Sequence, residues 1–125
     1  MSVWTVPATV VRIVDGDSVE LLADLGWRIS IGVSARLNGI NAIERRDPGG
    51  AEATAHLTEL IPPGSRVDLE SLGIDKFGGR TDCRLIRADG VDVAQQMVTD
   101  GYAAPWDGRG PRPVPPWPVP AVPGG

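Results

Sequence analysis

Hydrophobic and polar residues alternate through the first third of the chain, a pattern typical of β-strands. Residues 6–14 and 18–22 are rich in Val, Leu and Ile, and the polar run Asp15-Gly16-Asp17 between them predicts a hairpin turn. A second turn is predicted at Leu25-Gly26-Trp27. Residues 28–37 then place five apolar side chains on one face: Ile29, Ile31, Val33, Ala35 and Leu37. The chain therefore opens with a predicted meander of three strands.

Apolar positions at helical spacing predict two helices farther along. The first covers residues 51–61 and ends at Pro62-Pro63-Gly64. The second covers residues 92–100, where Asp92 can cap the first turn and Gly101 can take the left-handed position after the last one. Each helix presents one apolar stripe for burial, made of Ala53, Leu57, Leu60 and Ile61 in the first and Val93, Met97 and Val98 in the second.

Two more strands, over residues 66–72 and 84–88, complete the predicted sheet. The order of elements is then three strands, a helix, two strands and a helix. This order predicts an α+β fold, mainly β: a five-stranded OB-fold-like Greek-key barrel with two or more short helices. We expect residues 1–107 to form the barrel domain and residues 108–125 to form a Pro/Gly-rich extended tail outside it.

Composition narrows the possible functions. The chain has 125 residues, enough for one domain with a single core. Its formal net charge of -4 weighs against a tight nucleic-acid-binding protein, whereas an enzyme needs only a local positive patch. Cys83 is the one cysteine, so an internal disulfide is impossible and a core position is expected. The sequence shows neither a leader pattern nor an apolar run of membrane length, and we expect a monomer in the cytoplasm, with no membrane partner.

Oxygen ligands and arginines gather in three polar segments. The first is Asp15-Gly16-Asp17, the second covers residues 36–44, and the third covers residues 75–80. Taken alone, the first would indicate no more than a solvated turn. Together with the second segment, it offers the oxygens of Asp17 and Asn41, which suit Ca²⁺ because this ion prefers hard oxygen ligands.

Arginines and a further carboxylate supply the rest of the candidate chemistry. Arg36 and Arg80 can hold a phosphate through paired charge-assisted hydrogen bonds, and Glu44 can accept a proton from an attacking water. Arg80 is preferred to Arg84 because only Arg80 follows a glycine-rich loop, which allows the backbone to approach a ligand closely. These groups are the ones that metal-assisted phosphodiester hydrolysis requires.

Four motifs resemble the staphylococcal nuclease (thermonuclease) family, in that family's order and at nearly its spacing. They are Val14-Asp15-Gly16-Asp17-Ser18-Val19, Arg36-Leu37-Asn38-Gly39-Ile40-Asn41-Ala42-Ile43-Glu44, Asp75-Lys76-Phe77-Gly78-Gly79-Arg80 and Gly101-Tyr102-Ala103. The resemblance covers about residues 6–106. It implies a Ca²⁺-dependent endonuclease, a hydrolase whose substrate is DNA and, in several members of the family, RNA.

The resemblance also implies a role for each matching residue. The residues that would bind the metal are Asp17, Asn41 and Ala42 (through its backbone carbonyl), with Asp15 supporting them from outside the ligand sphere. The residues that would act in catalysis are Arg36, Glu44 and Arg80. Lys76 and Phe77 match positions that contact the substrate. Trp106 follows the second predicted helix, where an aromatic ring would stack on a base or, equally well, pack beneath the tail.

The chain departs from the family at several of these positions. Asn41 stands where an aspartate is usual, Ile43 where a proline is usual and Phe77 where a tyrosine is usual, while Gly79 is an additional residue. The alternative function is therefore a catalytically weakened OB-fold module that binds nucleic acid, although Glu44 would then place a purposeless negative charge beside a phosphate. A third possibility is an adaptor whose proline-rich tail binds a protein partner, a role that is compatible with catalysis.

Overall fold

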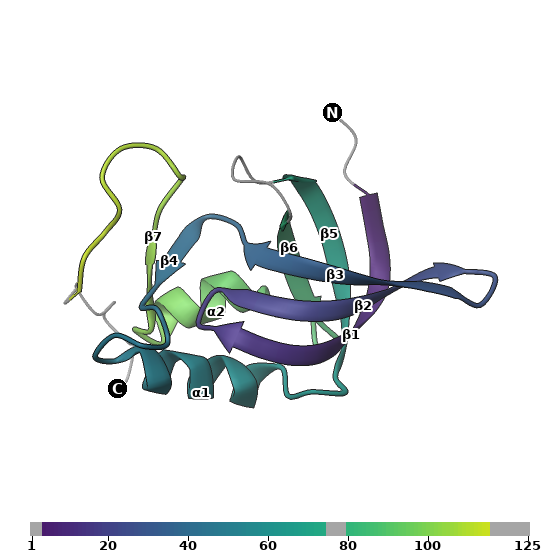
Figure 1. Ribbon diagram of the computed structural model, residues 1–125, viewed down its shortest axis with the longest axis horizontal. Helices are drawn as coiled ribbons and strands as arrows, with labels where there is room; N and C mark the ends of the chain where they lie inside the picture. Colours follow the sequence, from purple (N-terminus) through teal and green to yellow (C-terminus); the bar gives the residue numbers. More distant parts are fainter. Residues whose placement is uncertain (1–3, 75–79, 116–125) are drawn as a thin grey trace.

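Five strands close into a barrel in the computed structural model, which describes residues 4–74 and 80–115. The strands are β1 (Trp4–Asp15), β2 (Ser18–Gly26), β3 (Ile29–Leu37), β5 (Arg66–Ile74) and β6 (Thr81–Arg87). Their order around the barrel is β1-β2-β3-β6-β5, and β5 pairs with β1 to complete the circle (Figure 1). Only the β3–β6 pair is parallel among these neighbours. The predicted class, an α+β fold built on an OB-like barrel, is confirmed.

The β2–β3 hairpin extends well beyond the barrel (Figure 1). Only the last three residues of β3 pair with β6, so the first part of β3 leaves the barrel with β2. Along the predicted apolar face of β3, Ala35 and Leu37 are buried, but Ile29 and Ile31 remain 49% and 46% exposed. The alternating pattern gave the correct face of the strand, and the strand's departure from the barrel left half of that face outside the core.

The helix α1 (Gly50–Leu60) packs against β1 and lies beneath the barrel in Figure 1. It buries Ala53 and Leu57, two members of the predicted stripe, and Ile61 at its C-cap is also buried. The helix stops where Pro62 follows, because proline cannot donate the next helical hydrogen bond. Its first turn lies directly after the loop that carries Glu44, so the position of α1 helps to set the position of that loop.

The helix α2 (Val93–Thr99) begins and ends as predicted. The Asp92 carboxylate accepts a hydrogen bond from the backbone N–H of Gln95 at 3.2 Å, and Gly101 has a φ of 86°. His56 on α1 joins the two helices, since its Nε2 lies 2.6 Å from Oδ2 of Asp100 and its ring stacks on Tyr102 with centroids 4.2 Å apart. The single histidine therefore has a packing role between helices.

A small second sheet lies beside the barrel and was not predicted. It pairs β4 (Ile40–Ala42) with β7 (Ala103–Pro105), and places Asn41 opposite Ala104. No sequence pattern indicates these strands, because a run of three residues is too short to show periodicity. The second sheet fixes the loop after β3 against the segment that leads into the tail.

The buried thiol of Cys83 reports on the tightness of the barrel core. Cys83 is completely buried on β6, as expected from the sequence. Burial raises the pKa of this thiol to about 12, and the Asp82 carboxylate contributes to the rise by repelling a thiolate. Because the thiolate is the reactive form, the thiol should be inert in the folded protein.

We expect a thiol-specific reagent such as Ellman's reagent to label native Cys83 at pH 8 at least about a hundredfold more slowly than it labels the protein in guanidinium chloride. The chain has one cysteine, so the absorbance change reports this site alone. Similar rates in the two conditions would show that this part of the core opens readily.

Candidate active site

Asp17 joins the first turn of the chain to two other segments. Its carboxylate is buried and accepts hydrogen bonds from the backbone N–H of Ala42 at 3.0 Å and from the Ser18 hydroxyl at 3.1 Å. Its backbone carbonyl accepts a third hydrogen bond, from the N–H of Leu37 at 2.8 Å. One residue thus holds the turn between β1 and β2 against the end of β3 and against β4. These are the segments that carry the predicted metal ligands.

Gly16 allows this close approach. A Cβ atom added at Gly16 would lie 2.8 Å from the Cβ of Ala42 and 3.0 Å from the Cβ of Ala53, both shorter than ordinary carbon contacts. The turn, β4 and the first helix therefore meet where only a glycine fits. The glycine of the Asp-Gly-Asp motif has a packing role here, in addition to its role in the turn.

Asp15 presents a buried oxygen to the same region. Its Oδ1 has no hydrogen-bond partner among the described residues. The pKa of Asp15 is raised, mainly because burial disfavours the charged form and also because Asp17 and Glu44 repel it. Arg80 and Arg45 partly offset this rise. Three carboxylates thus share one electrostatic environment, which favours the approach of a cation.

Arg36 is held in place by the backbone of the following loop. Its two terminal nitrogens donate to the carbonyl oxygens of Leu37 at 3.1 Å and Ile40 at 2.9 Å. Its guanidinium carbon also lies 5.7 Å from the centre of the Trp106 ring, within the range of a cation–π interaction. A guanidinium has five N–H donors, so these two bonds leave donors for a phosphate.

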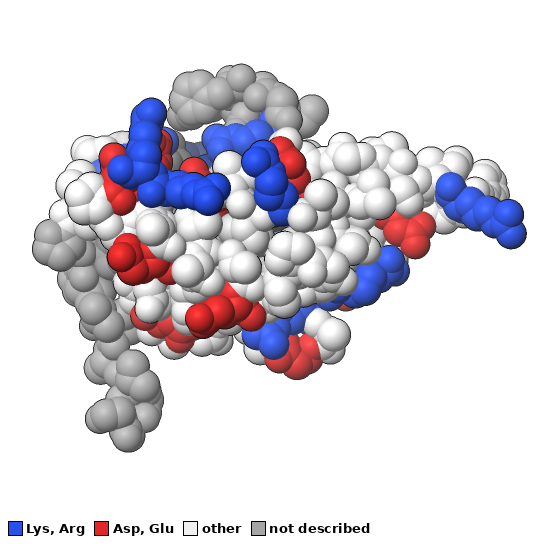
Figure 2. Space-filling model, turned by 60° about the horizontal axis from the view of Figure 1, so that its bottom comes forward, with Lys and Arg blue, Asp and Glu red and all other residues white. Residues whose placement is uncertain are grey.

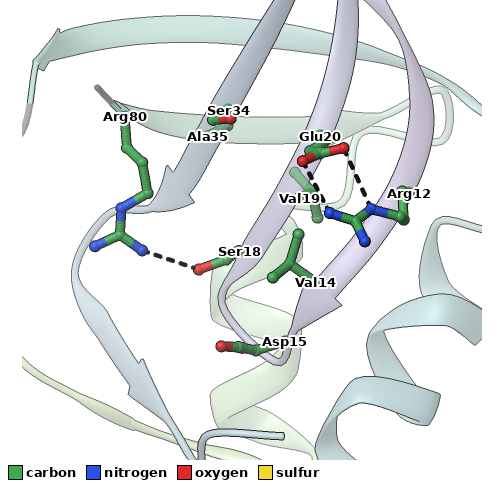
Figure 3. Close-up of a pocket in the computed structure, with 9 residues that line it drawn as sticks. All are labelled: Arg12, Val14, Asp15, Ser18, Val19, Glu20, Ser34, Ala35 and Arg80. Atoms are coloured by element: carbon green, nitrogen blue, oxygen red, sulfur yellow. Dashed lines mark hydrogen bonds and ion pairs between the residues drawn. The ribbon is translucent and has the colours of Figure 1, made fainter.

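Arg80 lies on the other side of Asp15 and Ser18 from the Arg12–Glu20 ion pair (Figure 3). These residues line an open cleft of about 360 Å³ on the outer face of the barrel. One terminal nitrogen of Arg80 donates to the Ser18 hydroxyl at 3.3 Å, and this hydroxyl itself donates to Asp17. Arg80 and the Asp15 carboxylate therefore border the same cleft, and Ser18 connects Arg80 to the buried Asp17.

Arg80 and Arg84 differ in the segments that their side chains contact. Arg84 forms ion pairs with Glu70 at 3.6 Å and with Asp92 at 3.4 Å. Glu70 lies on the neighbouring strand β5 and Asp92 caps α2, so these pairs direct Arg84 away from the first turn. Arg80 alone of the two contacts the segment that contains Asp15 and Asp17.

Glu44 lies half-exposed in the loop after β4. Its carboxylate forms ion pairs with Arg46 at 3.3 Å and with Arg112 at 3.8 Å, and its side chain is 45% exposed. Water therefore has access to this carboxylate, as a general base requires. Arg112 belongs to the segment expected to be a separate tail, and no sequence pattern indicated that it would come here.

Asn41 is buried at 5% exposure, and its side-chain nitrogen donates to the backbone carbonyl of Pro113 at 3.2 Å. Trp106 packs against Arg36 and Arg112, and its indole N–H donates to the carbonyl of Arg109 at 3.0 Å. The sequence left two roles open for Trp106, stacking on a base or packing beneath the tail, and these contacts are those of packing. Lys76 and Phe77 lie outside the described residues.

The oxygen donors of this region fit a hydrated divalent cation better than a fully enclosed one. Among residues 4–74 and 80–115, no three Asp, Glu, His or Cys side chains come close enough together to hold a metal ion. Asp17 nevertheless offers a hard, negatively charged ligand next to the backbone of Ala42, and the unpartnered oxygen of Asp15 adds negative charge beside it. Calcium accepts carboxylate, amide and carbonyl oxygens together with water.

The surface charge is mixed. Figure 2 shows acidic and basic side chains interspersed over one face of the molecule, without an extended area of one sign. Positive charge is therefore local on this face. In the part of the chain that the structure describes, no helix has the length and apolar composition needed to cross a membrane.

A comparison of the sequence with models of known protein families finds no match, and a comparison with characterised proteins finds none either.

Replacing Gly16 by alanine should disturb the site through packing alone. We expect Gly16→Ala to lower the free energy of unfolding by about 1–3 kcal/mol, because the added methyl group would collide with Ala42 and Ala53. Gly32→Ala is the matched control, since a Cβ added there meets nothing within 4 Å, and it should change stability by less than about 0.5 kcal/mol. Urea denaturation of both variants measures the difference, and equal stabilities would refute the close packing.

Proposed function

We propose that the protein is a metal-dependent nuclease of the staphylococcal nuclease type, which hydrolyses phosphodiester bonds in nucleic acid. The observation that carries the proposal is the chain of contacts from Arg80 through Ser18 and Asp17 to Ala42. It joins a phosphate-binding guanidinium, a buried carboxylate and the start of the loop that bears Glu44. These three functions must lie together for hydrolysis of a phosphodiester.

Each group has a defined task in this proposal. Arg36 and Arg80 bind the phosphate and stabilise the charge that builds on its oxygens, an effect typically worth about 10²–10³-fold per donor. Glu44 orients a water and takes its proton. A calcium ion, when bound by Asp17, Asn41 and the Ala42 carbonyl, would supply further charge stabilisation for the phosphate. Asp15 adds negative charge beside Asp17.

A nucleic-acid-binding module without catalysis is the second candidate. It is favoured by the neutral amide of Asn41 in place of a carboxylate and by the absence of a three-carboxylate cluster in the described part of the chain. The two candidates differ in what they require of Glu44. Catalysis needs its carboxylate, whereas binding of a phosphate would improve without it.

Substituting Glu44 and Arg36 one at a time should lower catalysis and leave the fold intact. We expect Glu44→Gln and Arg36→Lys each to lower kcat by about 10²-fold or more, because one loses the proton acceptor and the other loses the planar donor set. Glu59→Gln and Arg66→Lys, at exposed pairs elsewhere, are the matched controls and should retain the parent rate. Cleavage of a labelled oligonucleotide measures all four, and near-parent rates for Glu44→Gln and Arg36→Lys would show that the site is misassigned.

Restoring a carboxylate at position 41 should strengthen calcium binding. We expect Asn41→Asp to lower the Kd for Ca²⁺ at least about fivefold, since calcium affinity rises with the number of charged ligands, although repulsion from Asp17 limits the gain. Asn38→Asp adds the same charge at an exposed position in the turn just before β4 and should have a smaller effect. Isothermal titration calorimetry gives both constants. Equal affinities for the two variants would mean that residue 41 does not contact the ion.

A further inference from the structure

The segment after β7 turns back toward the candidate active site instead of leading away from it. The backbone N–H of Trp106 donates to the carbonyl of Gly39, and its indole N–H donates to the carbonyl of Arg109. The N–H of Arg109 in turn donates to the Asp107 carboxylate at 2.8 Å. These bonds form a turn just beyond the barrel, and Figure 1 shows the chain arching over and returning toward the loop before α1.

Two residues of the returning segment, Arg112 and Pro113, contact the site directly. The carbonyl of Pro113 accepts a hydrogen bond from the side chain of Asn41, and the Arg112 guanidinium lies 3.8 Å from Oε1 of Glu44. Arg112 also lies over the Trp106 ring, at 5.3 Å from its centre, so this one ring contacts both Arg112 and Arg36. The tail thus reaches a proposed metal ligand and the proposed general base at the same time.

These contacts conflict with catalysis in the arrangement that the structure shows. Asn41 is only 5% exposed and its amide is engaged by the tail. One oxygen of Glu44 faces the Arg112 guanidinium, which occupies part of the space beside a carboxylate that is otherwise open to water. Residues of the loop and the tail, including Asp47 and Val114, line a cleft of about 470 Å³ between them. A nucleic-acid strand that reached Asn41 and Glu44 from this side would have to displace the tail.

We propose that residues 109–115 form an autoinhibitory strap over the Asn41–Glu44 side of the site. The inference rests on the proposed nuclease function. The strap is weakly held at the site, because its contacts with Asn41 and Glu44 are one hydrogen bond to a neutral amide and one half-exposed ion pair, while Val114 is 77% exposed. Weak attachment suits a segment that must open for each strand of substrate.

The test compares two full-length variants, Arg112→Gln and Arg109→Gln. Both remove one positive charge from the same segment, but only Arg112 has a side-chain contact with Glu44 and Trp106 among the described residues. The first readout is docking of the strap, which NMR monitors through the side-chain amide signals of Asn41 and the indole signal of Trp106. The second is the Kd for a fluorescent single-stranded DNA oligonucleotide in Ca²⁺, and the third is kcat/KM for its cleavage.

We expect Arg112→Gln to shift both NMR signals, to lower the Kd for the oligonucleotide and to raise kcat/KM about three- to tenfold relative to Arg109→Gln, the range expected for losing one half-exposed ion pair and one cation–π contact. Unchanged NMR signals would overturn the strap. Weaker binding or slower cleavage by Arg112→Gln would also overturn it, and would make Arg112 a substrate-binding residue.

The outcome for the strap remains distinct from that for the nuclease function. If neither the variants nor the parent cleave DNA, the nuclease proposal fails. The Kd values for the oligonucleotide then decide whether the strap covers a binding site. Tighter oligonucleotide binding by Arg112→Gln than by Arg109→Gln would still support a strap that covers the site. Equal binding would overturn it.

Discussion

The site depends on the hydrogen bonds that the buried residue Asp17 accepts. The carboxylate accepts the N–H of Ala42 and the hydroxyl of Ser18, while the carbonyl of the same residue accepts the N–H of Leu37. A buried carboxylate without such donors would be strongly disfavoured, so these bonds fix the turn, the end of β3 and β4 relative to one another. Gly16 permits the contact because no Cβ intervenes. Asp17, itself a proposed ligand, thus holds the first turn, the end of β3 and β4 together.

The proposed function requires an acidic chain to present a site for an acidic substrate. The net charge is -4, and basic side chains are interspersed with acidic ones on the face that Figure 2 shows. Attraction for a phosphate must therefore be local, at Arg36 and Arg80, each of which is held by hydrogen bonds. Guanidiniums that are already oriented lose little entropy on binding, so a small number of them can replace a broad basic surface.

The sequence predicted the barrel because its strands and helices depend on local signals, whereas the roles of the site residues stay predictions. Alternation of apolar residues identified β1, β2 and β3, and the cap at Asp92 identified α2. The preference for Arg80 over Arg84 agrees with the contact to Ser18. What the sequence missed has no local signal. The three-residue strand β4 is stabilised by its pairing with β7, and β3 leaves the barrel because β6 pairs with only part of it.

The tail illustrates the same limit. A proline- and glycine-rich composition correctly indicated a segment without helices or strands beyond residue 107 in the part described, residues 108–115. Composition carries no information about where such a segment lies. The contacts of Arg112 with Glu44 and of Pro113 with Asn41 depend on the turn that Trp106, Asp107 and Arg109 form, and a turn of this kind becomes visible only in three dimensions.

The most direct test of the central claim is DNA cleavage by the purified protein, with plasmid and single-stranded DNA, in Ca²⁺ and then in excess chelator. A Glu44→Gln preparation purified in parallel controls for contaminating nucleases. The account predicts cleavage of DNA in Ca²⁺, its loss in chelator, its return when Ca²⁺ is restored, and little cleavage by the control. Cleavage that is undiminished in chelator, or no cleavage by the parent protein in any divalent cation, would contradict it.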